Sequence, residues 1–133
     1  MLAKRCYDHE DVDACRDRLE SQLLAWDRLA ATGTPELEAF EPVFFNLLVI
    51  GLDHAFAERL TAPEGCSTDA LTEVRVLAAS LSGDGRLTVD RTVRWRAETT
   101  VLGYRPGDLI AVREEGFRAL AKALLAELEM LVA

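Results

Sequence analysis

The sequence is short of positive charge and of cysteine, and each shortage argues against a class of protein. Fifteen basic residues stand against 23 acidic ones, which leaves a net charge of −8. Because nucleic-acid binders need clustered positive charge to neutralise phosphates, we expect no nucleic-acid partner. The three cysteines are odd in number and form no CxxC pair, so we expect no disulfide framework. We expect the protein to lie in a reducing compartment.

Long hydrophobic runs are also missing. The longest apolar stretch, residues 43–52, is interrupted by Asn46 and is well short of the roughly 20 residues that span a bilayer. The first basic residues, Lys4 and Arg5, are followed by acidic residues and not by an apolar signal core. We therefore expect a soluble cytoplasmic protein with no membrane partner.

The familiar catalytic and cofactor-binding motifs are absent as well. The chain contains no GxSxG, P-loop, HExxH or GxGxxG. This removes positive support for an enzyme without excluding one, and we expect no cofactor and no metal. Cys6, His9 and Cys15 could ligate zinc with Cys66 or His54, but their spacing matches no strong zinc pattern.

What the sequence does contain is the balance of a globular protein. Half of its 133 residues are hydrophobic and 29% are charged, which indicates one folded domain, residues 1–133. Apolar residues at steps of three and four predict three amphipathic helices. They span residues 9–32, residues from Ser67 or Thr68 to 82, and residues 114–132.

A fourth helix is predicted over residues 42–60, and its apolar residues point in every direction. We expect it to be the central element, buried on all sides, because a helix that is apolar all round has no face suited to water. Its start is placed at Pro42, whose missing N–H costs nothing in a first turn. The residues expected to be buried in it are Phe44, Phe45, Leu48, Val49 and Leu52.

The stretch between the third and fourth helices in chain order changes character. Residues 92–97 alternate apolar and polar side chains, as a half-buried strand does, and residues 109–112 follow a turn signal at Pro106 and Gly107. We expect two or three short strands here, with an ordered loop as the alternative. The predicted fold is mainly α, with four main helices and a small β element between helices three and four.

Two stretches of the sequence resemble known proteins. They are FFNLLVIGLDHAF and LTEVRVLAASLSGDGRLTVDRTVRWRAETTVLGYRPGDLIAVREEGFRALAKALLAELE. Over residues 44–129 the chain thereby resembles a family of small bacterial proteins of unassigned function. The resemblance implies a free-standing domain, and it implies no activity and no site residue.

Five polar residues make up the candidate ligand-binding site: Asn46, Asp53, His54, Arg94 and Arg96. Asn46 lies in the most apolar run, so its amide must find a partner or cost roughly 1–3 kcal/mol. The carboxylate of Asp53 beside His54 could support acid–base chemistry, although the pair could equally mark where the helix enters solvent. The two arginines suit a carboxylate, a phosphate or an acidic protein, or they pair with the protein's own acids.

The terminal helices favour self-association. Their apolar stripes are long and nearly heptad-spaced, and residues 114–132 carry further apolar side chains beside the stripe. We expect a non-enzymatic interaction or assembly domain, such as an accessory or regulatory subunit, that forms a homo-oligomer. An acidic protein or a small anionic ligand is a further candidate partner. The alternative is a ligand-binding protein or enzyme with a pocket between the central helix and the Arg-rich segment.

Overall fold

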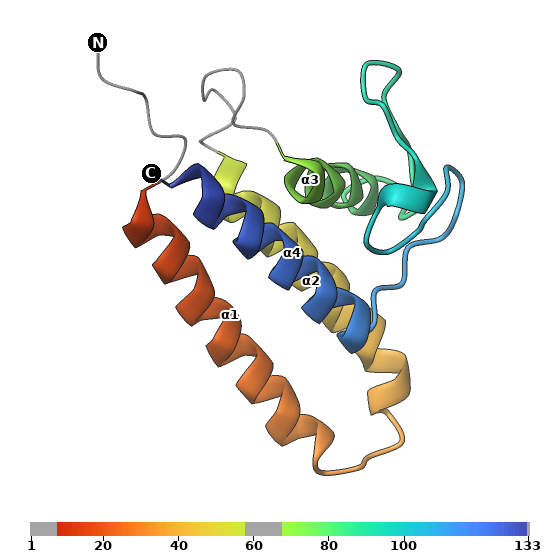
Figure 1. The fold of residues 1–133 in the computed structure, drawn as a ribbon. Helices are drawn as coiled ribbons and strands as arrows, with labels where there is room; N and C mark the ends of the chain where they lie inside the picture. The colour runs from red at the N-terminus through yellow and green to blue at the C-terminus, as the bar shows by residue number, and fades with distance from the viewer. Residues whose placement is uncertain (1–7, 58–67, 133) are drawn as a thin grey trace.

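Four α-helices form the framework of the computed structural model, which describes residues 8–57 and 68–132 (Figure 1). The helices are α1 (His9–Ala30), α2 (Leu37–Ala57), α3 (Asp69–Leu81) and α4 (Glu114–Leu131). A short 3-10 helix, η2 (Ala97–Thr99), lies in the long connection between α3 and α4. α1, α2 and α4 run roughly side by side, and α3 is turned across them (Figure 1). The mainly helical, four-helix prediction is confirmed.

The ends of α1 and α3 follow the expected local signals. Gly33 stops the first helical segment, because its φ of +67° is a conformation that other residues rarely adopt. At the start of α3, the hydroxyl oxygen of Thr68 accepts a hydrogen bond from the N–H of Leu71 at 3.1 Å. The alternative cap, Ser67, lies outside the described residues, as do residues 58–60 of the predicted central helix.

The predicted start of α2 is wrong. The helix begins at Leu37, so Pro42 lies inside it and not in its first turn. A proline at this position leaves the carbonyl four residues earlier, that of Glu38, without its helical donor. Arg113 supplies the replacement, because its Nη1 donates to the Glu38 oxygen at 3.0 Å. The lost helical bond is thus replaced by a contact between the start of α4 and the start of α2.

The prediction that α2 is buried on all sides is also wrong. Its inner side lies in the core, where Phe45, Leu48, Val49 and Leu52 are buried as expected and Phe44 is half-buried. Its outer side is exposed, with Val43 at 53% and Leu47 at 60% of full exposure. The reason is packing: α1, α3 and α4 together cover only the inner side, so α2 forms an edge of the bundle and not its centre.

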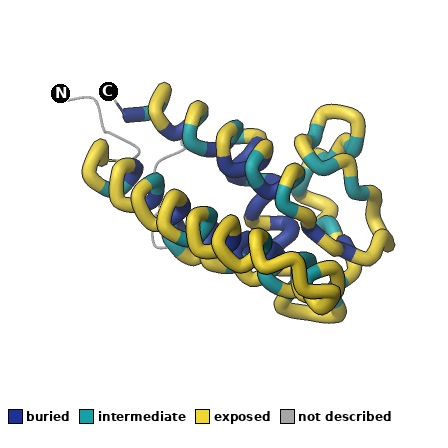
Figure 2. The backbone as a smooth tube through the Cα atoms, turned by 90° about the horizontal axis from the view of Figure 1, so that it is seen from below, coloured by how far each residue is buried: buried dark blue, intermediate teal, exposed yellow. Residues whose placement is uncertain are grey.

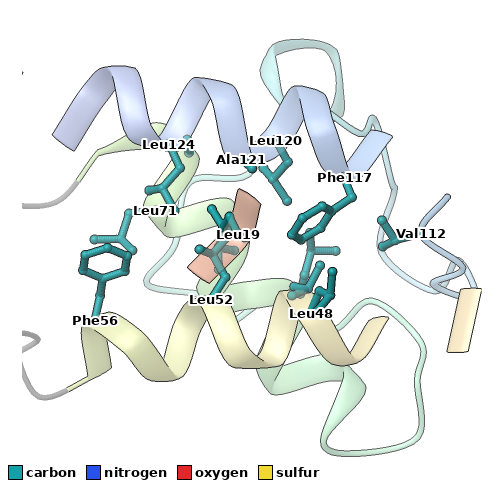
Figure 3. Close-up of a cluster of buried hydrophobic side chains, with 14 of the residues drawn as sticks. Leu19, Leu48, Leu52, Phe56, Leu71, Val112, Phe117, Leu120, Ala121 and Leu124 are labelled. Carbon is teal, nitrogen blue, oxygen red and sulfur yellow. The ribbon is translucent and has the colours of Figure 1, made fainter. Parts of the chain in front are cut away.

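The core lies where the four helices face one another (Figures 2 and 3). Leu48, Leu52 and Phe56 of α2 point toward α4, and Phe117, Leu120 and Leu124 of α4 point back toward them (Figure 3). The apolar stripe of α4 that suggested a seam with a second copy is therefore used inside the protomer, and so are Val12, Cys15, Leu19 and Trp26 of α1.

The predicted β element is not found. Residues 82–113 contain no strand, and an isolated bridge pairs Arg86 with Leu109. The alternation of residues 92–97 does not produce a strand, because the carboxylate of Asp90 accepts hydrogen bonds from both the N–H and the hydroxyl of Thr92 and so turns the chain. The ordered-loop alternative describes this segment correctly.

Candidate functional site

A groove of about 800 Å³ lies between α2, α3 and residues 88–94, within the size range of small-molecule sites. One face of α3 runs along it, because residues three and four apart share a helix face. The lining residues from α2 are Ile50 and Asp53, and those from α3 and its C-cap are Asp69, Thr72, Arg75, Val76, Ala78, Ala79 and Ser82. The loop contributes Thr88, Asp90, Thr92, Val93 and Arg94.

The carboxylate of Asp53 lines this groove and has one oxygen without a partner among the described residues. Its Oδ1 is buried and accepts no hydrogen bond from any residue that the structure describes. Burial raises the pKa of Asp53 above its ordinary value, and the nearby positive charge of Arg75 and the neighbouring His54 oppose that rise. A buried acceptor without a donor costs free energy. The carboxylate as a whole is half-buried and lines the groove, so a ligand that brings an N–H or O–H group to it would be favoured.

The guanidinium groups of Arg75 and Arg94 are the complementary groups. Neither makes a hydrogen bond or an ion pair with another residue in the described ranges. By contrast, Arg113 and Arg118 are held in ion pairs with Glu41, Asp27 and Glu114. Arg75 and Arg94 therefore retain their capacity to bind a carboxylate or a phosphate.

The other arginines of the Arg-rich segment also lack acidic partners among the residues that the structure describes. Within residues 8–57 and 68–132, no ion pair involves Arg91, Arg96 or Arg105. The interpretation that these arginines pair with the protein's own acids therefore finds no support in the described part of the chain. The alternative, a surface that receives an acidic group, remains a prediction.

The structure brings two of the five predicted site residues together. Asp53 and Arg94 both line the groove, from α2 and from the loop respectively. His54 is exposed and Arg96 immediately precedes η2, and neither is among the residues that line the groove.

Asn46 has a structural role away from the groove. Its Nδ2 donates to the carbonyl oxygen of Ile110 at 3.2 Å, and its Oδ1 accepts from the N–H of Val112 at 3.0 Å. The expectation that its amide finds a partner is confirmed. In this geometry the side chain bonds both groups of an extended backbone segment, as a neighbouring strand would.

Glu73 is a second polar contact of this kind, and the sequence analysis missed it. Its side chain is 3% exposed, and its two oxygens accept hydrogen bonds from the N–H groups of Val101 and Leu102 at 2.7 and 2.9 Å. Burial raises the pKa of Glu73, while the two N–H donors lower it and the nearby Glu127 raises it further. The signal that could have found it is an acid within the apolar stripe of α3, between Thr72 and Val74.

The contribution of α3 to the groove was also missed. Its apolar stripe predicts core residues, and the polar positions Asp69, Thr72 and Arg75 lie on the neighbouring face. Their spacing of three residues places them along one side of the helix. Read together with Asp53, this spacing points to a polar surface where α2 and α3 meet.

A second candidate surface is the outer side of α2, which we call the α2 outer face and define by Phe40, Val43, Leu47 and Gly51. The first three side chains are exposed, and no heavy atom lies within 4 Å of a Cβ added at Gly51. The segment Leu37–Phe56 is long and apolar enough to cross a membrane by length and composition, a test that core helices of soluble proteins also pass. The expectation from residues 43–52 alone underestimated this apolar length.

The zinc interpretation can be followed only in part, because Cys6 and Cys66 lie outside the described residues. Cys15 is buried in the core, and burial raises the pKa of its thiol. In the portion of the chain that the structure describes, no three His, Cys, Asp or Glu side chains gather in a geometry that could hold a metal ion.

Comparisons with models of protein families, with curated proteins and with solved structures find no match to this chain. The resemblance over residues 44–129 therefore gains no support from them.

Proposed function

We propose that this chain is a non-enzymatic, cytoplasmic interaction and assembly domain, an accessory or regulatory subunit that forms a homodimer through the α2 outer face. The observation that carries this proposal is the exposure of Phe40, Val43 and Leu47 in a row along one helix. Contiguous exposed apolar side chains usually mark an interface, because leaving them in water is unfavourable.

The pattern along this face suits a second copy of the same helix. In an antiparallel pair with Leu47 on the two-fold axis, each residue faces the one equally far on the other side of Leu47. Val43 then faces Gly51, whose missing side chain leaves room for it, and Phe40 faces His54. Large residues thus face a small residue or an imidazole across the two-fold axis, and none of these facing residues carries a carboxylate or a guanidinium group.

The decisive experiment is light scattering on a size-exclusion column over a tenfold range of micromolar concentration. The wild type is expected to give the mass of two chains, and Leu47→Glu that of one. Leu109→Glu is the matched control, because Leu109 is 61% exposed and does not belong to the α2 outer face. A wild-type mass of one chain at every concentration would refute the homodimer. Binding of that single chain to neutral phosphatidylcholine vesicles would assign the face to a bilayer instead.

A second candidate function is the binding of a small ligand in the groove. It is favoured by one observation: an unpartnered buried acceptor, Asp53 Oδ1, and the unpaired guanidinium of Arg94 line the same groove among the described residues. Saturable amide shifts at lining residues such as Val76 and Val93 on addition of a ligand would support it, whereas ligands that leave those signals unmoved would count against it.

A further inference from the structure

The groove between α2, α3 and residues 88–94 contains unsatisfied groups of opposite charge. Asp53 Oδ1 lacks a hydrogen-bond donor, and the guanidinium groups of Arg75 and Arg94 lack acceptors, within the part of the chain that the structure describes. A ligand that satisfies both kinds of group must carry a donor and an acceptor, since each buried polar group left without a partner costs free energy.

Ligands of a single charge fit this groove poorly. An anion could bind Arg75 and Arg94, but it would meet the carboxylates of Asp53, Asp69 and Asp90 and would leave Asp53 Oδ1 without a donor. A cation could bind Asp53, but it would leave both guanidinium groups unpaired and would be repelled by them. A zwitterion satisfies both sets of groups.

The arrangement of the groove indicates a ligand larger than a single amino acid. Its volume of about 800 Å³ is ample, and Asp53 and Arg94 come from different elements, α2 and the loop. A peptide with its ammonium and carboxylate at opposite ends of an extended backbone suits two residues on different elements, and each extended residue adds about 3.3–3.6 Å of reach. The hydroxyl oxygens of Thr88, Thr92 and Ser82 can accept hydrogen bonds from peptide N–H groups between the two ends, since each hydroxyl already donates its proton within the chain.

We propose that this groove binds a short zwitterionic peptide, about two to three residues long, with its terminal ammonium at Asp53 and its terminal carboxylate at Arg94. The small apolar side chains of Ile50, Val76, Ala79 and Val93 contact the peptide's own side chains. The inference rests on the second function proposed above, ligand binding in the groove, and is independent of the α2 outer face.

Titration of the 15N-labelled full chain with trialanine, followed by amide shifts, tests the proposal. Trialanine is expected to give saturable shifts at Val76, Ala79 and Val93. N-acetyl-trialanine, which lacks the ammonium, and trialanine amide, which lacks the carboxylate, should each bind at least about tenfold more weakly, as the loss of one charge-assisted hydrogen bond predicts.

Two variants assign the ends of the peptide. Asp53→Asn should weaken the binding of trialanine by about tenfold and leave the already weak binding of N-acetyl-trialanine nearly unchanged. Arg94→Gln should likewise weaken the binding of trialanine and leave that of trialanine amide nearly unchanged. The matched controls are Asp17→Asn on the exposed side of α1 and Arg91→Gln in the loop, neither of which lines the groove. Both controls should bind trialanine like the wild type, and unchanged amide spectra outside the groove verify that each variant is folded.

Succinate is a purely anionic probe and 1,4-diaminobutane a purely cationic one. Together they distinguish failure of the peptide inference from failure of the proposed ligand binding in the groove. If succinate or the diamine shifts the groove residues and trialanine does not, the groove is a binding site and the peptide inference is overturned. If none of the probes shifts those residues at millimolar concentration, both are overturned. Equal affinity for trialanine and its two blocked forms would also overturn the inference.

Discussion

The four helices and the segment of residues 82–113 differ in how much of their support comes from hydrogen bonds made by side chains. The helices meet through buried apolar side chains. The segment contributes Leu87, Ile110 and Val112 to the same core, and polar side chains also bond its backbone: Asn46 at residues 110 and 112, and Glu73 at residues 101 and 102. Burial acts over an area, whereas each hydrogen bond fixes one peptide group. Loss of a core side chain should therefore lower global stability, and loss of one polar contact should loosen the segment locally.

The largest effect is expected where the core is most enclosed. Phe45 is fully buried and its ring contacts those of Trp26, Phe44 and Phe117, so Phe45→Ala should lower the free energy of unfolding by about 3–5 kcal/mol. Leu47→Ala, on the exposed side of the same helix, should change it by no more than about 0.5 kcal/mol. Urea unfolding at low protein concentration measures both values. Similar losses in the two variants would show that α2 has no inner and outer side.

Loss of a polar contact comes next. Asn46→Leu keeps the approximate size of the side chain and removes both hydrogen bonds to the segment, at a cost of roughly 2–3 kcal/mol. The cost should be local, because the N–H of Val112 loses its acceptor while Phe117 keeps its helical bond to Arg113. Amide hydrogen exchange should accelerate at Val112 more than at Phe117. Equal acceleration at both positions would mean that the segment and the helices unfold as one unit.

The carboxylate of Glu73 adds a dependence on pH. Its pKa is raised in the folded protein by burial, so the folded state binds a proton more tightly than the unfolded chain does. Its contribution to stability is therefore complete below the ordinary pKa of glutamate and is lost as pH rises from that value through the raised pKa. Glu73→Gln should remove this part of the loss of stability with rising pH. The difference between the free energies of unfolding of wild type and variant over a pH series measures it.

Subtraction of the two curves cancels the contributions of Asp53 and of the other acids, which are common to both proteins. Glu127 faces Glu73 from α4 and its Oε2 accepts the N–H of Ala70, so Glu127→Gln is a useful comparison. It should lower the pKa of Glu73 and narrow the pH window without abolishing it. A wild-type curve parallel to that of Glu73→Gln at all pH values would contradict the assignment.

The helical framework was predictable because its signal is spread over many residues. The apolar repeats of α1 and α4 identify both helices to within about two residues of their observed ends. The extent of α2 was not predictable in the same way, because Pro42 is tolerated inside the helix only through the contact of Arg113 with Glu38. That contact joins residues 75 positions apart, and no local pattern contains it.

The candidate site was only partly predictable, for a related reason. The sequence points to Asp53 as a carboxylate beside His54 and to Arg94 as an arginine suited to an anion, and the structure places both in the groove. The sequence points to Asn46 as a polar residue inside the most apolar run, yet its amide bonds the backbone of Ile110 and Val112. Whether a polar side chain faces a ligand or a distant backbone depends on the path of residues 82–113, which follows from hydrogen bonds and not from a periodic pattern.

The smallest effects are expected at two glycines, one on the open side of α2 and one packed against the segment of residues 82–113. Gly51 and Gly116 are both helical, and replacing either with alanine reduces the entropy lost on folding, worth up to roughly 0.5–1 kcal/mol. At Gly51 a new Cβ meets no heavy atom within 4 Å, so Gly51→Ala should stabilise the chain by that amount. At Gly116 the Cβ would lie 2.9 Å from a terminal methyl group of Leu102, whose backbone is held by Glu73, so the gain should be smaller or absent.

Thermal unfolding at low protein concentration compares the two variants, with Gly51→Ala expected to be the more stable. The same substitution should act in the opposite direction on the proposed homodimer, because Val43 of the second copy then faces a methyl group where it faced open space. Gly51→Ala is thus expected to raise the midpoint of unfolding of the single chain and to weaken association in light scattering. An increase in both the midpoint of unfolding and the strength of association would show that Gly51 lies outside the interface and that the two-fold axis does not pass through Leu47.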